Sequence, residues 1–153
     1  MSTLKDQLKS DLTTAIKSRD EVTSATLRMV LTAVTNEEVA GKEARTLSDE
    51  DVLTVLGREG KKRRESAEAY DAADRPELAD RERAELEVLT RYLPQQLTDD
   101  EVASIVAAAV AEAAAAGAGG EAMGQVMRLV QPQVKGRADG GVVAGLVKAA
   151  LGM

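Results

Sequence analysis

The chain has 153 residues, and its 20 lysines and arginines against 26 aspartates and glutamates give a formal net charge of −6. It contains no histidine, cysteine, tryptophan or phenylalanine. These absences exclude Ser-His-Asp and Cys-His nucleophiles, thiol redox chemistry, a disulfide framework and an ordinary zinc site. Tyr70 and Tyr92, the two aromatic residues, are too few for base stacking along a nucleic-acid strand. The composition favours a scaffold, adaptor or binding module over a self-sufficient enzyme.

No stretch of the sequence is typical of a leader or of a membrane span. The N-terminal residues MSTLKD are charged almost at once and lack the apolar core of a signal peptide. Residues 102–120 are the one candidate span, but they are mostly alanine, carry Glu112 and end in glycines. A charge near the bilayer centre costs about 2.5–3.5 kcal/mol on the insertion scale. We therefore expect a soluble helix there, no membrane partner and a cytoplasmic location.

Apolar residues recur at helical spacing along nearly the whole chain, and no window alternates as a strand would. This pattern predicts an all-α fold. In chain order, helices are expected over about residues 4–20, 27–41, 49–73, 76–93, 99–116, 123–132 and 142–151. Ser48 with Asp51, and Thr98 with Glu101, have the spacing of capping boxes at the starts of the third and fifth helices. Pro132 is expected to disturb the sixth.

Two regions of different composition divide the chain. Pro76 suits the first position of the fourth helix, and the short polar turn before it indicates that the third and fourth helices form a long charged hairpin. Up to residue 97 the chain carries 16 basic and 20 acidic residues, whereas from Thr98 onward it carries 4 and 6 among many alanines. We therefore predict a four-helix, bundle-like N-terminal domain over residues 1–94 and a three-helix C-terminal domain over residues 98–153.

The most distinctive local sequence is KGRADGG, residues 135–141, between the last two helices. Its glycines would let the backbone approach a phosphate, the next helix would present unpaired N–H groups, and Lys135 with Arg137 would add positive charge. The same residues also fit a glycine-rich turn in which Asp139 caps the last helix. The spacing of a Walker loop is absent. These residues alone leave a phosphate anchor and an ordinary helix cap open.

A dense basic run lies on the third helix and contains Arg58, Lys61, Lys62, Arg63 and Arg64. Such a run suits a nucleic acid or an acidic protein. However, Glu59 lies four residues before Arg63, and two further pairs with this spacing follow, which is typical of a solvated helix face. Gly60 costs about 1 kcal/mol relative to alanine inside a helix, and it indicates a closely packed neighbour or the backbone of a partner.

The acidic clusters have ordinary explanations, with one exception. Residues 49–51 and 99–101 lie where a helix N-terminus favours negative charge, and neither histidine nor EF-hand spacing accompanies them. We therefore expect no metal site and no cofactor. Glu37 and Glu38 lie late in a helix, where the helix dipole disfavours them, and the sequence offers no account of that pair. The methionines are interpreted as core filler at Met29, Met123 and Met127.

Four motifs follow one another along the chain: REGKKRRES at 58–66, YLPQQL at 92–97, MGQVM at 123–127 and KGRADG at 135–140. As a set, in this order and spacing, they resemble the YqeY-type proteins of the GatB/YqeY family. The resemblance covers essentially the whole chain. It implies a helical N-terminal bundle followed by a C-terminal domain similar to the tail of GatB.

GatB is a subunit of the glutamine-dependent aminoacyl-tRNA amidotransferase, a carbon–nitrogen ligase, and its tail helps to recognise the tRNA. The ATP-using and amidase parts of that enzyme lie outside the tail. The resemblance therefore implies an accessory role with tRNA or aminoacyl-tRNA and no catalytic residues in this chain. It places tRNA binding at the matching positions and their neighbours, which are Arg128, Lys135, Gly136, Arg137, Asp139, Gly140 and Lys148.

Two other functions stay open at this point. As a protein–protein adaptor, the charged hairpin would present four cations to an acidic partner: Arg58, Lys61, Lys62 and Arg64. As an amidotransferase in its own right, the chain would need a nucleotide site, and the sequence contains no motif for one.

Overall fold

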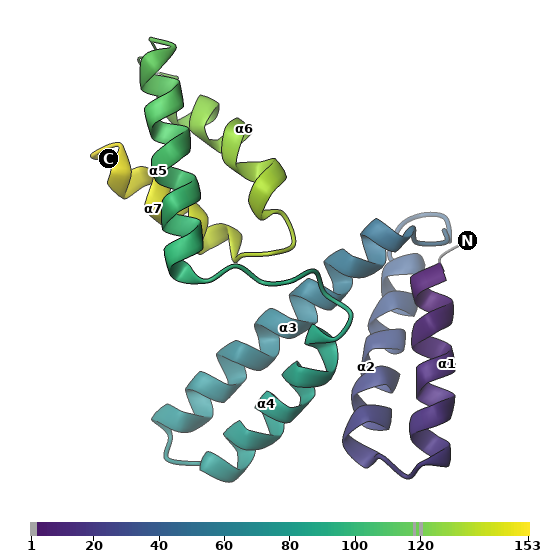
Figure 1. Ribbon diagram of the computed structural model, residues 1–153. Coiled ribbons are helices and arrows are strands. Elements are labelled where there is room, and N and C mark those ends of the chain that lie inside the picture. The colour runs from purple at the N-terminus through teal and green to yellow at the C-terminus, as the bar shows by residue number, and fades with distance from the viewer. Residues whose placement is uncertain (1–2, 118, 120) are drawn as a thin grey trace. The chain divides into compact units, whose positions relative to one another are not determined.

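The computed structural model describes residues 3–117, 119 and 121–153, and in this part of the chain it contains α-helices and loops but no strand (Figure 1). The helices are α1 (Thr3–Lys17), α2 (Glu21–Glu38), α3 (Asp49–Ala72), α4 (Pro76–Thr90), α5 (Asp99–Ala115), α6 (Ala122–Val134) and α7 (Gly140–Ala150). The prediction of an all-α fold is confirmed. The chain divides into two compact units, one ending at Leu93 and the other beginning at Pro94.

Side-chain caps explain where several helices begin. A side-chain oxygen accepts a hydrogen bond from a first-turn amide at Asp20 for α2, Ser48 for α3, Thr98 for α5 and Asp139 for α7. At α3 the capping box is reciprocal, because the Asp51 carboxylate also accepts from the Ser48 amide. Helix α4 begins instead with Pro76, whose missing N–H would have no partner in the first turn. The helix starts that the sequence indicated at Ser48, Pro76 and Thr98 are therefore present in the structure.

The N-terminal unit consists of two helical hairpins, α1–α2 and α3–α4, around one apolar core (Figure 1). Its fully buried side chains include Leu8, Leu27, Val30, Val34, Leu47, Val52, Leu56 and Leu89. Gly60 of α3 is buried at the contact with α4, where a Cβ atom would lie 3.5 Å from Leu86 Cδ1. The closely packed neighbour of Gly60 is thus a helix of the same chain.

The loop between α2 and α3 is held by the acidic pair that the sequence left unexplained. Glu38 Oε1 lies 2.7 Å from Lys5 Nζ, and its Oε2 accepts a hydrogen bond from the Leu47 amide at 3.2 Å. Glu37 Oε2 lies 3.2 Å from Arg58 Nη2. These contacts offset the unfavourable position of two carboxylates at a helix C-terminus. The hydrogen bonds from Lys5 and from the Leu47 amide also hold the pKa of Glu38 below its usual value.

The C-terminal unit packs α5, α6 and α7 around a small core of valine and alanine. Helix α6 continues through Pro132 and ends at Val134, so the expected disturbance of this helix is not observed. The proline lies in the last turn, where it removes one N–H and little helix remains to be broken. Within the described ranges, none of the helices combines the length and the apolar character that crossing a bilayer requires.

Candidate functional site

The KGRADGG turn, for which the sequence left a phosphate anchor and a helix cap open, connects α6 to α7. Gly136 has φ of +74°, in the left-handed region that favours glycine. Asp139 Oδ1 accepts a hydrogen bond from the Gly141 amide at 2.7 Å and so caps α7. A Cβ atom at Gly141 would lie 3.2 Å from that same oxygen. Helix capping therefore accounts for Asp139, one of the two interpretations that the sequence left open.

Arg137 fastens the segment that leads into α5. Its Nε donates to the Gln95 carbonyl at 3.1 Å, and its own carbonyl accepts from the Leu97 amide at 2.8 Å. Gln96 Nε2 donates to the Gly136 carbonyl at 3.0 Å. These residues form a clamp, named here the Arg137 clamp, that joins the YLPQQL and KGRADG motifs. The guanidinium of Arg137 thus has main-chain acceptors within the protein.

The other cations predicted to bind tRNA lie on the surface of the C-terminal unit. Arg128 is exposed on α6, Lys135 is exposed directly after that helix, and Lys148 is exposed in the last turn of α7. Arg128 and Lys135 are seven residues apart, close to two helical turns, so they lie on the same side of α6. Arg128 also lines an open hollow with Glu121 and Gly124. The fold therefore groups Arg128 and Lys135 on one face.

The basic run of α3 is divided between the surface and the interior. Four of its cations are exposed or half-exposed, at Arg58, Lys61, Lys62 and Arg64. Arg63 is only 4% exposed and points into the N-terminal unit. Its Nη1 lies 2.5 Å from Glu59 Oε2, so the predicted pair forms, but inside the bundle and not on a solvated face. A charged run without an apolar stripe gave no sign that one of its arginines would be buried.

Arg63 belongs to an ion-pair network that joins α2, α3 and α4. Its Nε lies 3.6 Å from Glu85 Oε2. Arg81 in turn lies 3.3 Å from Glu85 and 2.8 Å from Glu21, and the hydrogen bonds to both raise the pKa of Arg81 above its ordinary value. Burial, reinforced by the charge of Glu85, raises the pKa of Glu82. The network holds α2 against the α3–α4 hairpin.

Met29 lies over this network and not in the core. Its sulfur is 3.7 Å from Arg63 Nη2, and its side chain is 45% exposed. The interpretation of Met29 as core filler is therefore wrong, because the residue lies at the edge of α2 that faces a buried charge. Met123 and Met127 do pack against the core of the C-terminal unit, as expected.

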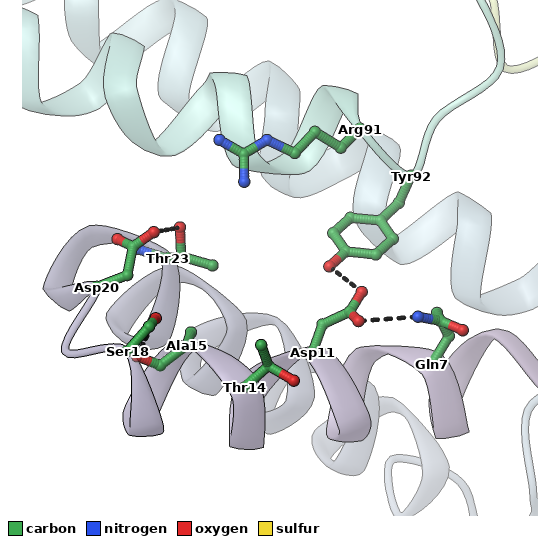
Figure 2. A pocket seen from close by; sticks show the side chains of 9 residues that line it. All are labelled: Gln7, Asp11, Thr14, Ala15, Ser18, Asp20, Thr23, Arg91 and Tyr92. Atoms are coloured by element: carbon green, nitrogen blue, oxygen red, sulfur yellow. Dashed lines mark hydrogen bonds between the residues drawn. The ribbon is translucent and has the colours of Figure 1, made fainter.

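A pocket of about 510 Å³ in the N-terminal unit was not predicted from the sequence (Figure 2). It lies between α1, the start of α2 and the residues that follow α4. The Tyr92 hydroxyl donates to Asp11 Oδ2 at 2.6 Å across it. Burial and this hydrogen bond raise the pKa of Tyr92. The two partners are 81 residues apart in the chain, so no local pattern could have indicated the contact.

The remaining polar groups of the pocket have structural partners as well. Asp20 accepts from the amide and the hydroxyl of Thr23, and the amide hydrogen bond holds the pKa of Asp20 below its usual value. Arg91 extends over the pocket from the opposite side (Figure 2). The side chains that line the pocket therefore connect α1 to the end of α4, through the hydrogen bond from Tyr92 to Asp11. In the part of the chain that the structure describes, no group of three or more acidic side chains is placed to hold a metal ion.

Comparisons with known proteins place this fold in a family. The model of the Yqey-like proteins matches residues 5–151. An uncharacterized protein of Schizosaccharomyces pombe is 30% identical over 93 residues, which cover 60% of this chain and 73% of that protein. Altered inheritance of mitochondria protein 41 of Saccharomyces cerevisiae is 30% identical over 97 residues, or 62% of this chain and 51% of that protein.

The protein of the same name from Candida glabrata is 25% identical over 88 residues, or 58% of this chain and 48% of that protein. The match thus spans about half the length of these mitochondrial relatives. The family model, in contrast, covers nearly all of the present chain. The chain belongs to the YqeY-like family.

Proposed function

We propose that this chain is a non-catalytic accessory protein that associates with tRNA through its C-terminal unit. The observation that carries the proposal is the shared face of Arg128, on α6, and Lys135, directly after that helix, two exposed cations seven residues apart. Phosphate contacts by exposed lysine and arginine supply most of the affinity in non-specific nucleic-acid binding. The resemblance of this region to the tail of GatB, which helps to recognise tRNA, supports the same partner.

The Arg137 clamp gives the other signature residues a role in this function. The clamp and the Asp139 cap hold the chain at the end of α6, where Lys135 leaves the helix. Gly136 allows the left-handed turn at that point. In this proposal Arg128 and Lys135 contact phosphates, whereas Arg137, Gly136 and Asp139 position the turn. Lys148 and Gly140 are exposed, and in this proposal they contribute less to tRNA binding than Arg128 and Lys135 do.

The test is the affinity of the full chain for bulk bacterial tRNA at two salt concentrations. We expect micromolar binding at low salt that weakens as salt is raised, because each phosphate contact releases a condensed counterion. Arg128→Ala/Lys135→Ala is expected to weaken binding about 10-fold at low salt and to flatten the salt dependence. Arg137→Ala is not the variant of choice, since it breaks the clamp.

Lys17→Ala/Arg28→Ala is the matched control. It removes two exposed cations of the N-terminal unit and changes the net charge equally. An equal loss of affinity in both double variants would mean that only net charge matters, and it would contradict the proposed face. No binding of tRNA by the unmodified chain at low salt would reject the function itself. Turnover of ATP by the pure protein would contradict its non-catalytic character.

A further inference from the structure

Met29 of α2 places an accessible sulfur against a buried cation of α3. The sulfur accepts a hydrogen bond from Arg63 Nη2 at 3.7 Å, although Met29 itself is 45% exposed. A thioether sulfur is a weak hydrogen-bond acceptor. The other partners of the guanidinium are carboxylates, Glu59 on α3 and Glu85 on α4. The side of the guanidinium that faces α2 is therefore its weakly satisfied side.

The guanidinium of Arg63 has fewer acceptors than its burial requires. Arg63 is 4% exposed, and a guanidinium carries five N–H donors. Nη1 donates to the carbonyl and to the carboxylate of Glu59. Nε lies 3.6 Å from Glu85 Oε2, and in the described ranges it is the buried side-chain polar atom that lacks a hydrogen-bond partner. Since an unsatisfied buried donor costs free energy, a stronger acceptor beside this guanidinium would stabilise the N-terminal unit.

Oxidation of the Met29 sulfur would supply such an acceptor. With hydrogen peroxide, a lone pair of the sulfur forms an S–O bond, the O–O bond of the peroxide breaks, and water leaves. The sulfur is oxidised by two electrons, the peroxide is reduced, and the product is methionine sulfoxide. The sulfoxide oxygen is polar, and the three rotatable bonds of the methionine side chain allow it to turn toward Arg63 Nη2.

We propose that Met29 is a methionine-oxidation site at which the sulfoxide accepts a hydrogen bond from Arg63 Nη2 and strengthens the contact between α2 and α3. Oxidation of a methionine inside a core is disruptive, because it places a polar group among apolar side chains. At Met29 the new polar group meets a buried guanidinium instead. Peroxide is therefore expected to stabilise the N-terminal unit. This inference is independent of the proposed tRNA association.

The other described methionines make the comparison specific. Met153 is 74% exposed at the end of the chain, so it is oxidised readily, but it belongs to the C-terminal unit. Met123 and Met127 pack against the apolar core of that unit, where a sulfoxide is destabilising. A stabilising effect of oxidation on the N-terminal unit would therefore not come from these three residues.

The test treats the full chain with dilute hydrogen peroxide and follows thermal unfolding by tyrosine fluorescence. Tyr70 and Tyr92 both belong to the N-terminal unit, so the signal reports that unit. Peptide mass spectrometry gives the extent of oxidation at each methionine. Oxidation at Met29 is expected to raise the unfolding midpoint by about 4 °C, the effect of one added hydrogen bond in a unit of this length. Methionine sulfoxide reductase should return the midpoint to its starting value.

Met29→Leu is the matched control, because it keeps the remaining methionines and leaves no sulfur beside Arg63. Peroxide should not raise its midpoint. Met29→Gln, whose amide oxygen stands in for the sulfoxide, should be more stable than Met29→Leu without peroxide, since the two residues have similar helix propensities.

Several outcomes would overturn the proposal. One is a midpoint of the unmodified protein that falls or stays unchanged once Met29 is oxidised. Another is an equal rise in the Met29→Leu protein, which would assign the effect to a different residue. A Met29→Gln protein no more stable than Met29→Leu would refute the hydrogen bond to Arg63. Failure of Met29 to react in the folded chain, while Met153 does, would refute the site itself.

Discussion

At the scale of single residues, Arg63 is notable because it is a charged side chain buried inside the N-terminal unit. Its guanidinium is almost entirely buried, and Glu59 and Glu85 lie beside it. A buried ion pair is weak evidence for stability, because desolvation offsets much of the attraction. Removal of one member is nevertheless costly, since it strands the other charges. Arg63 therefore links α3 to α4 through Glu85, although the intact ion pair adds little net stability.

Arg63→Met is expected to lower the free energy of unfolding by about 3 kcal/mol, because Glu59 and Glu85 lose their buried partner. Arg63→Met/Glu85→Leu should recover a large part of that loss. Urea denaturation followed by circular dichroism measures both, and Arg64→Met, at the half-exposed neighbour, is the control. An Arg63→Met protein as stable as the control would show that the network contributes nothing.

Tyr92 gives the N-terminal unit a dependence on alkaline pH. The pKa of Tyr92 is raised in the folded protein by burial and by the hydrogen bond to Asp11, whereas a tyrosine in the unfolded chain has a pKa of about 10. Above about pH 10 the unfolded chain releases this proton first, so the stability of the folded state falls as pH rises. Tyr92→Phe should remove that part of the decline and lower the stability near neutral pH by about 1–2 kcal/mol.

The measurement is urea unfolding at pH 8 and at pH 10.5, with Tyr70→Phe as the matched control. An identical decline in the unmodified protein and in the Tyr92→Phe protein would contradict the assigned role of the Asp11 hydrogen bond.

Asp20 gives the stability of the folded state a dependence on acidic pH. The hydrogen bond from the Thr23 amide holds the pKa of Asp20 below its usual value. The stability that ionised Asp20 contributes is therefore fully present above the usual pKa of an aspartate and is lost as pH falls through the lowered pKa.

At the scale of elements, the helices were predictable because their signals are local. Apolar spacing, the caps at Ser48 and Thr98 and the proline at position 76 each act within one or two turns, and the structure follows them. Helix α2 begins earlier than its apolar pattern indicated, because Asp20 caps it ahead of its first leucine. Helix α6 continues past Pro132 because the proline lies in the final turn.

Contacts between distant elements could not be predicted in this way. Glu85 reaches Arg63 from another helix, and Gln95 reaches Arg137 across 42 residues. In both cases a residue that the sequence indicates as a surface cation has a distant partner, through an ion pair for Arg63 and a hydrogen bond for Arg137. The sequence thus indicated a set of basic residues as candidates for the site. Which of them face solvent followed only from the fold.

The Arg137 clamp yields a prediction at this scale. Arg137→Ala removes the guanidinium hydrogen bond to the Gln95 carbonyl and should lower the stability of the C-terminal unit by about 1 kcal/mol. The amide of Leu97 should then exchange with solvent faster, because the segment before α5 is less well held. Hydrogen exchange monitored by NMR checks this, with Lys148→Ala as the exposed control. Unchanged exchange at Leu97 would contradict the clamp.

At the scale of the whole molecule, the net charge of −6 limits how strongly any polyanion can bind. An acidic protein with one small group of exposed cations, at Arg128 and Lys135, should bind RNA weakly, and the binding should fall as salt is raised. Such behaviour suits an accessory protein that associates with tRNA and releases it readily. The family assignment rests on a match over residues 5–151, whereas tRNA as the partner is our proposal, argued from the arrangement of the cations.

The most direct test of this account is an acetylation footprint of the lysines in the full chain at low salt, with and without bulk tRNA. We predict that tRNA slows the acetylation of Lys135 several-fold and leaves Lys17 and Lys42 unchanged. All three residues are exposed in the structure, so Lys17 and Lys42 serve as internal references. Equal rates at Lys135 with and without tRNA, or equal slowing at all three lysines, would contradict the central claim.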